Sequence, residues 1–176
     1  MASQTMSIAR YILLAAAARE DQDIDQYTSG NLARRIAMAL ASAAHENDEY
    51  SLLFTGRVIA ELYVLLLRHV SNKSGRTESL YKEIRKLPAW GGRYRAADFI
   101  CPNPGVWQHC AELDISPRVW KDLQFLRRYG NIACHANTRI DYDHLAKELA
   151  AKARECICRI GLVSAVWATR LAKSNL

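Results

Sequence analysis

The chain has 176 residues, a formal net charge of +6 and a sequence pI near 9.2. Half of the residues are hydrophobic, and no apolar run approaches the roughly 20 residues that a membrane-spanning helix needs. These values exclude a disordered chain and indicate one domain with a full core. Ala and Leu are abundant while β-branched runs are scarce, which predicts an all-α fold. The basic excess favours a polyanionic partner, although charge that serves solubility alone is an equal alternative.

Five cysteines are present, an odd number, and the apolar stretch at residues 11–18 is too short for a secretory signal. We therefore expect a cytoplasmic protein with reduced thiols and no membrane association. Five residues could be considered as zinc ligands, namely Cys101, His109, Cys110, Cys134 and His135. They include no Cys-x-x-Cys pair, and the chain has no phosphate-binding or dinucleotide-binding glycine motif, so we expect neither a metal site nor a cofactor.

Apolar residues at helical spacing predict helices at residues 5–19 and from 28 or 29 to 44. The most apolar segment, residues 52–69, predicts a central third helix. Glu61 lies within it, and two interpretations stay open. The carboxylate forms an ordinary i,i+4 pair with Arg57, or it is buried and orients a neighbouring basic or amide group.

A short helix is predicted at residues 78–87, and Pro88 ends it. The stretch 89–117 is irregular, and loops this long inside a domain often serve binding. It contains a cluster of basic and aromatic residues, Trp90, Arg93, Tyr94 and Arg95. The cluster is a candidate for stacking on unpaired nucleic acid bases. Anchoring of the loop by Trp90 in an apolar pocket is at least as good an interpretation.

Ser116 and Pro117 predict the start of the next helix, as N-cap and first helical residue. A long final helix is predicted from 141 or 142 to 172, with an inward stripe of Leu145, Leu149, Ala153, Cys156, Ile160, Val163, Trp167 and Leu171. The sum is a helical bundle with a long inserted loop. We expect an N-terminal helical extension at 1–48 packed on a domain at 49–176, in one compact unit.

Arg128, Asn131 and His135 form the main candidate site. If the helix continues through Gly130, their spacing places them on one face within two turns. An arginine binds phosphate through two N–H groups, a histidine transfers protons near neutral pH, and an asparagine orients either partner. The set suits metal-independent cleavage of RNA. From spacing alone, however, the better interpretation is that Asn131 bridges helices and His135 is a core residue.

The segment Arg128-Tyr-Gly-Asn-Ile-Ala-Cys-His135 resembles the signature of the HEPN superfamily, and more closely its DUF4145 branch. The segment Gly56-Arg-Val-Ile-Ala-Glu-Leu-Tyr63 resembles an upstream helix of that branch, in which an Arg and a Glu lie in an apolar run. The resemblance covers residues 52–160. One departure is that Gly130 stands where catalytic members often carry an arginine directly before the asparagine.

The resemblance implies a homodimer of helical bundles and a metal-independent endoribonuclease of a prokaryotic or phage conflict system, such as toxin–antitoxin or antiviral defence. His135 would then be the acid and base, Arg128 the phosphate clamp and Asn131 the orienting residue, with Glu61 behind them. The alternative is a non-catalytic DUF4145-like module that binds another protein as an inhibitor or accessory subunit. A third hypothesis is nucleic acid binding without cleavage, through residues 90–95.

Overall fold

The computed structural model describes residues 2–17, 29–73, 116–135 and 142–173, and these residues form five helices and no strand. The helices are α1 (Ala2–Ala17), α2 (Ser29–His45), α3 (Glu49–Lys73), α7 (Pro117–Cys134) and α8 (Tyr142–Lys173). The all-α prediction is confirmed. The predicted helix at 78–87 and nearly all of the predicted irregular stretch 89–117 lie outside the described residues.

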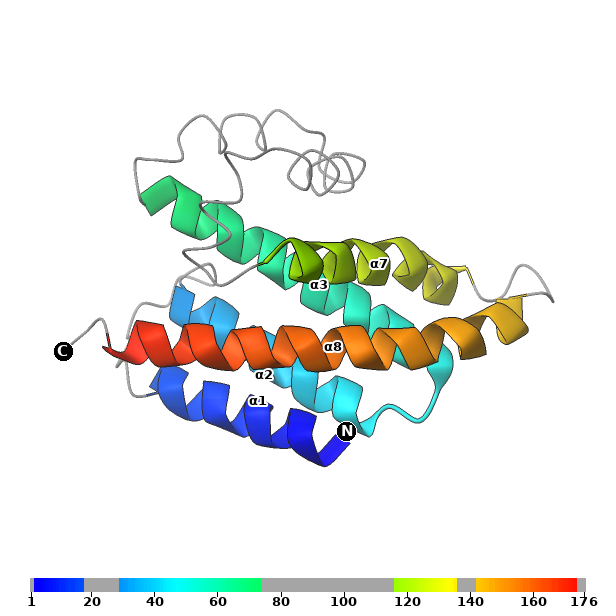
Figure 1. The fold of residues 1–176 in the computed structure, drawn as a ribbon, viewed down its shortest axis with the longest axis horizontal. Coiled ribbons are helices and arrows are strands. Elements are labelled where there is room, and N and C mark those ends of the chain that lie inside the picture. Colours follow the sequence, from blue (N-terminus) through cyan, green and yellow to red (C-terminus); the bar gives the residue numbers. More distant parts are fainter. Residues whose placement is uncertain (1, 18–28, 74–115, 136–141, 174–176) are drawn as a thin grey trace.

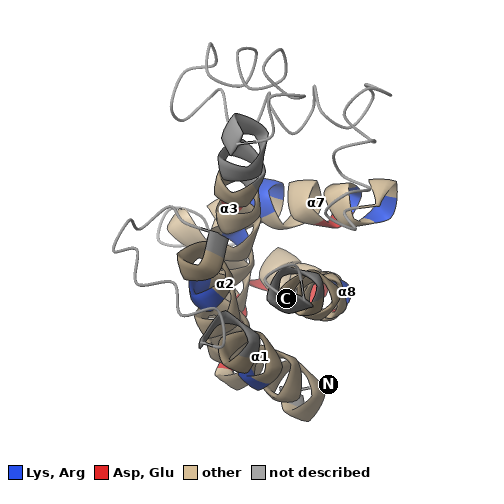
Figure 2. Cartoon of the chain, turned by 90° about the vertical axis from the view of Figure 1, so that its left-hand side faces the viewer, with Lys and Arg blue, Asp and Glu red and all other residues tan. Residues whose placement is uncertain are grey.

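The five helices pack in two groups. Figures 1 and 2 show α1, α2 and α3 in one row, with α7 and α8 beside it. The long helix α8 contacts every other described helix, and α7 contacts α3 and α8. None of the described helices contains an apolar stretch long enough to cross a membrane.

All five helices contribute to the core. Its fully buried side chains include Ile12, Ile36, Tyr63, Trp120 and Ile160, one from each helix in chain order. Burial of each large apolar side chain contributes about 1.5–3 kcal/mol. The Tyr63 hydroxyl donates to the Ile160 carbonyl oxygen over 3.0 Å and also hydrogen-bonds the hydroxyl of Ser164. The central helix α3 is thereby joined to α8 by a satisfied polar group as well as by packing.

Two glycines allow α3 and α7 to cross closely. A Cβ at Gly56 would lie 2.8 Å from Leu126 Cδ2, and a Cβ at Gly130 would lie 2.5 Å from Arg57 Cβ and 2.9 Å from the Leu53 carbonyl oxygen. Both glycines are helical and buried. At Gly130 only a residue without a side chain fits, whereas a Cβ at Gly56 would require the end of the Leu126 side chain to move. The crossing therefore sets the position of Arg57 against the C-terminal half of α7.

The predicted start of α7 is confirmed, because the Ser116 hydroxyl oxygen accepts a hydrogen bond from the Val119 N–H over 3.4 Å and Pro117 is the first helical residue.

One part of the predicted α8 stripe is wrong. Leu145 is 37% exposed, whereas Ala146 and Ala150 are buried. The small side chains of these alanines allow the first turns of α8 to pack closely. Because alanine is only weakly hydrophobic, a hydrophobicity pattern does not single out these positions. The later stripe positions Ala153, Cys156, Ile160 and Trp167 are buried as predicted.

Candidate functional site

The C-terminal end of α7 carries the three residues of the predicted site. The helix continues through Gly130 to Cys134, as the predicted spacing requires. His135 follows as the C-cap, with φ −121° and ψ 14°, and its backbone N–H donates to the Ile132 carbonyl oxygen over 3.1 Å. Arg128 and Asn131 therefore lie within the helix at a spacing of three residues, which puts them on one face. His135 lies one residue beyond the helix, and its backbone has the conformation of the cap.

Arg128 and His135 are both exposed, and Asn131 is half-buried between them in the chain. The guanidinium carbon of Arg128 lies 5.6 Å from the centre of the Tyr129 ring, within reach of a cation–π interaction. Seven residues of helix correspond to about 10 Å along its axis. Arg128 and His135 are therefore about 10 Å apart along α7.

The basic side chain in contact with Asn131 is Arg57 of α3. Its Nη1 donates to Asn131 Oδ1 over 2.9 Å and to Cys134 Sγ over 3.0 Å. Its side chain is 17% exposed, so these bonds are partly shielded from water. Arg57 therefore links two neighbouring turns of α7 to the central helix.

Glu61 holds the other side of this guanidinium. Arg57 Nε donates to Glu61 Oε1 over 3.3 Å, one helical turn away on α3, and the carboxylate side chain is 24% exposed. The i,i+4 pair considered from the sequence is present. Glu61 is half-buried and not fully buried, and an orienting role for it stays a prediction.

This arrangement has a consequence for the chemistry of Asn131. Because its Oδ1 accepts from Arg57, the other end of the amide is an N–H donor. A donor beside a guanidinium suits an anionic oxygen such as that of a phosphate. A side chain at Gly130, directly before Asn131, would collide with Arg57 Cβ. The cation beside Asn131 comes from Arg57 of α3.

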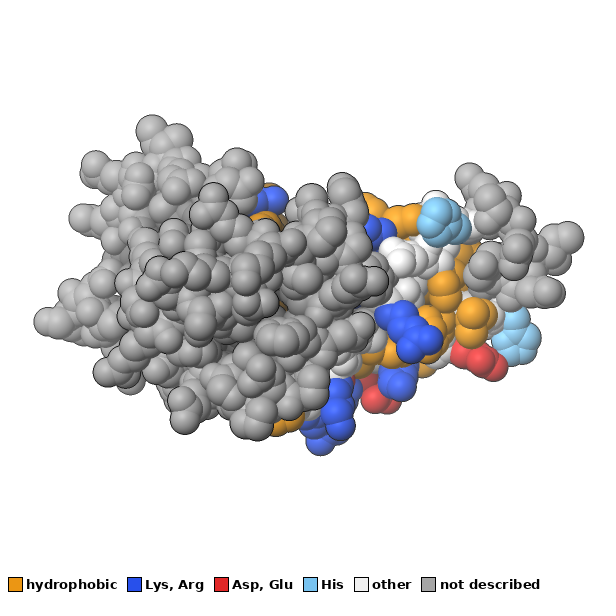
Figure 3. All heavy atoms as spheres, turned by 90° about the horizontal axis from the view of Figure 1, so that it is seen from above, with side chains coloured by type: hydrophobic (Ala, Val, Ile, Leu, Met, Phe, Trp, Pro, Cys, Tyr) orange, Lys and Arg blue, Asp and Glu red, His pale blue; other side chains and the backbone are white. Residues whose placement is uncertain are grey.

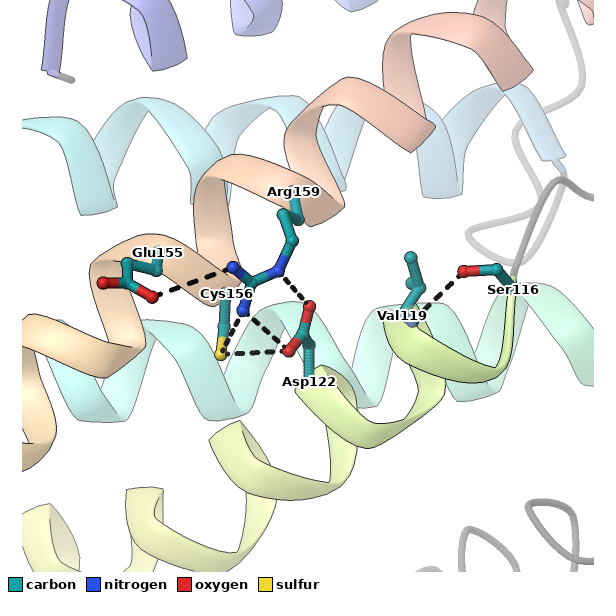
Figure 4. A network of polar contacts seen from close by, with 6 residues as sticks. All are labelled: Ser116, Val119, Asp122, Glu155, Cys156 and Arg159. Carbon is teal, nitrogen blue, oxygen red and sulfur yellow. Dashed lines mark hydrogen bonds and ion pairs between the residues drawn. The ribbon is translucent and has the colours of Figure 1, made fainter.

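A second polar cluster joins α7 to α8 (Figure 4). Arg159 of α8 donates to both carboxylate oxygens of Asp122, from Nε over 2.7 Å and from Nη2 over 2.9 Å, and the Cys156 thiol donates to the same carboxylate over 3.3 Å. Burial and the neighbouring Asp122 raise the pKa of Cys156 to about 12, so this thiol stays protonated. The cluster is satisfied internally, and its geometry indicates a structural role.

Four residues of the predicted nucleic acid-binding cluster belong to a segment that the structure does not describe. Trp90, Arg93, Tyr94 and Arg95 lie outside the described residues. The described residues contain no group of three or more His, Cys, Asp or Glu side chains that could hold a metal ion.

Sequence reasoning missed Arg57 as a member of the site, although it noted this arginine as a possible partner of Glu61 and as part of a segment with a family resemblance. An arginine within the most apolar segment of the chain was the available signal, because such a side chain needs a specific partner. The partner itself lies 74 residues away in the sequence and follows only from the helix crossing.

The fold and site define an all-α protein with a polar cluster where α3 and α7 cross. A comparison of the chain with protein-family models, with curated proteins and with solved structures finds no match.

Proposed function

We propose that the protein acts on RNA as a metal-independent endoribonuclease, with its site at the C-terminal end of α7. The observation that carries the proposal is the contact of Arg57 with Asn131 beside two exposed residues, Arg128 and His135. It gathers two arginines, an oriented amide and a histidine on one end of the bundle. This is the chemistry that a phosphodiester requires when no metal assists.

In the proposed reaction, the 2′-hydroxyl oxygen of RNA bonds to the adjacent phosphorus, and the bond from phosphorus to the 5′-oxygen breaks. His135 accepts the proton of the 2′-hydroxyl as the base, and its imidazolium then gives this proton to the 5′-oxygen of the leaving strand as the acid. The products are a 2′,3′-cyclic phosphate and a 5′-hydroxyl. Arg128 neutralises the charge that grows on the phosphate oxygens, and Asn131 donates to one of them from the amide that Arg57 orients.

The resemblance to the HEPN superfamily supports the same proposal. It adds a homodimer, in which two copies of the site share one cleft, and a role in a prokaryotic or phage conflict system. A cytoplasmic location belongs to this proposal as well.

The second candidate is a non-catalytic module that binds another protein. The observation that favours it is the use of Arg57 within the fold, where it bonds Asn131, Cys134 and Glu61 at once. Such a network is sufficient to fix α7 on α3 without any catalytic duty. In this case Asn131 is a bridge between helices, and Arg128 and His135 are ordinary surface residues.

Cleavage of end-labelled RNA by the purified protein in EDTA separates the two candidates. We expect fragments that end in a cyclic phosphate, and we expect His135→Ala and Arg128→Ala to lose most of the activity. Both residues are exposed, so the variants should fold, which circular dichroism and thermal unfolding check. Arg34→Ala on the exposed face of α2 is the control and should cleave like wild type. Failure of the wild type to cleave at high concentration refutes the nuclease, as does unchanged cleavage by the His135 variant.

A further inference from the structure

The outward face of α7 carries positive charge and no exposed acid. Arg118, Lys121 and Arg128 are exposed along it at spacings of three and seven residues, which places them on one side of the helix. The helix contains one acidic residue, Asp122, and that side chain is buried and bonded to Arg159. The charge of this face is therefore not balanced within its own helix.

Two aromatic rings lie beside these cations. Phe125 and Tyr129 are half-buried neighbours on successive turns, with ring centres 4.8 Å apart and planes inclined by 46°. Lys152 of α8 places its ammonium nitrogen 4.8 Å from the centre of the Phe125 ring, and Arg128 lies near the Tyr129 ring. Each ring thus has an exposed cation beside it.

The acidic residues of α8 closest in sequence to Lys152 have other partners. Glu148 pairs with His144 over 3.5 Å, and Glu155 pairs with Arg159 over 3.8 Å. In the view from above, Lys and Arg side chains lie beside hydrophobic ones on the described part of this face, and the acidic side chains lie at its edge (Figure 3).

We propose that the outward face of α7 is a platform for an unpaired nucleic acid strand, which it guides towards His135. Phe125 and Tyr129 supply surfaces on which bases stack, and Arg118, Lys121, Arg128 and Lys152 bind the phosphates. Alternating rings and cations are what a single strand requires, because its bases are free to leave their stack and every base has an aromatic face. A duplex offers phosphates but no accessible base faces along its side, and a protein partner offers no regular row of negative charge.

If the platform is present, the substrate of the proposed nuclease is single-stranded RNA. This inference rests on the proposed function only for the choice of RNA over DNA. Stacking and phosphate binding do not need the 2′-hydroxyl, whereas the proposed cleavage does. A thymidine DNA strand is therefore a probe that the platform binds and that the proposed reaction leaves intact. Binding of this probe tests the platform even if no RNA is cleaved.

The test is the fluorescence anisotropy of a labelled single-stranded thymidine oligomer with the full chain, titrated at several salt concentrations, with a duplex of equal length in parallel. We expect tighter binding of the single strand and a steep loss of affinity with salt. Phe125→Leu keeps an apolar side chain but removes the ring, and it should weaken binding about five-fold or more. The double variant Lys121→Gln/Lys152→Gln should weaken binding and reduce the salt slope by about one unit or slightly more.

The double variant Arg34→Gln/Arg35→Gln removes the same charge from the exposed face of α2 and should bind like wild type. Circular dichroism and thermal unfolding verify that each variant is folded. The platform is refuted by equal or tighter binding of the duplex, by no binding of the single strand at low salt, or by an equal loss in the α2 variant. Binding that follows these expectations while RNA stays uncut would retain the platform and reject the nuclease.

Discussion

Arg57 Nη1 donates a hydrogen bond to Asn131 Oδ1 over 2.9 Å and so joins the central helix to the end of α7. The bond depends on two further features. Gly130 leaves room for Arg57 to pass along α7, and Glu61 holds the guanidinium from its other side. A crossing between two helices, rather than a motif within one of them, defines the geometry of the candidate site.

The first prediction concerns Arg57 as a positioning residue. Arg57→Gln removes charged hydrogen bonds to Asn131, Cys134 and Glu61, so the free energy of unfolding should fall by about 1–3 kcal/mol in urea titrations. Arg128→Gln should change it by less than about 0.5 kcal/mol, because that side chain is exposed.

RNA cleavage should fall in both variants. Arg57→Lys keeps the charge but not the planar fork, so it should recover substrate affinity more fully than the turnover rate. Equal stability of the Arg57→Gln and Arg128→Gln variants would contradict the proposed positioning role.

The second prediction compares two helical glycines. Gly130→Ala forces a Cβ against Arg57 Cβ at 2.5 Å and against the Leu53 carbonyl oxygen at 2.9 Å, and both belong to a packed helix that has to shift. We expect a loss of about 1–3 kcal/mol in the free energy of unfolding. A Cβ at Gly161 would meet only Ile8 and Leu40 side-chain atoms at 3.6–3.7 Å. Gly161→Ala should therefore stabilise the protein by about 0.5–1 kcal/mol, because alanine favours the helix. A stable Gly130→Ala variant would show that α3 and α7 do not cross in this way.

The sequence was sufficient for the helices because hydrophobic periodicity and capping are local signals. Ser116 and Pro117 located the start of α7 to the residue, and the apolar run of α3 marked it as central. The inward position of Leu145 was predicted wrongly, since hydrophobicity alone ranks leucine above the alanines that the helix buries.

The site was predictable only in part, because its contacts join distant segments. Spacing identified Arg128, Asn131 and His135 as a group, but it gave no reason to add Arg57 or to expect a cap at His135. Spacing likewise gave no reason to pair Phe125 of α7 with Lys152 of α8, although the two side chains meet in space. Such pairs follow from helix packing, which no local pattern specifies.

The third prediction tests the ion pair between α7 and α8. Asp122→Ala leaves Arg159 without its bidentate partner, and because the Asp122 side chain is only 10% exposed the change should cost about 2–3 kcal/mol. The loss stays below that of a fully buried pair since Arg159 is 30% exposed and is partly hydrated. Glu155→Ala removes the other acid on Arg159, which is exposed and 3.8 Å away, and should change stability by less than about 0.5 kcal/mol. Urea unfolding of the two variants provides the comparison, and similar effects would argue against a dominant role of Asp122 in holding Arg159.

The fourth prediction uses the different surroundings of two thiols. Cys156 is fully buried and its pKa is raised to about 12, whereas Cys134 is exposed at the end of α7. In the folded protein, an alkylating reagent at neutral pH should modify Cys134 and should reach Cys156 only after unfolding. Mass spectrometry of peptides after brief labelling, with and without urea, distinguishes the two sites. Rapid labelling of Cys156 without urea would show that α7 and α8 separate readily.

The raised pKa of the Cys156 thiol also leads us to expect a lower free energy of unfolding in alkaline solution. The folded state holds the Cys156 proton more tightly than the unfolded chain does, because burial and Asp122 raise the pKa of the thiol above its ordinary value. Its contribution to stability is therefore complete below the ordinary pKa of a thiol and is lost as the pH rises from there towards about 12. Over this window the free energy of unfolding should fall by roughly 1 kcal/mol per pH unit for this one group. Cys156→Ala should lower stability at neutral pH and show a shallower alkaline decline, and parallel pH profiles for the variant and the wild type would exclude this thiol as the cause.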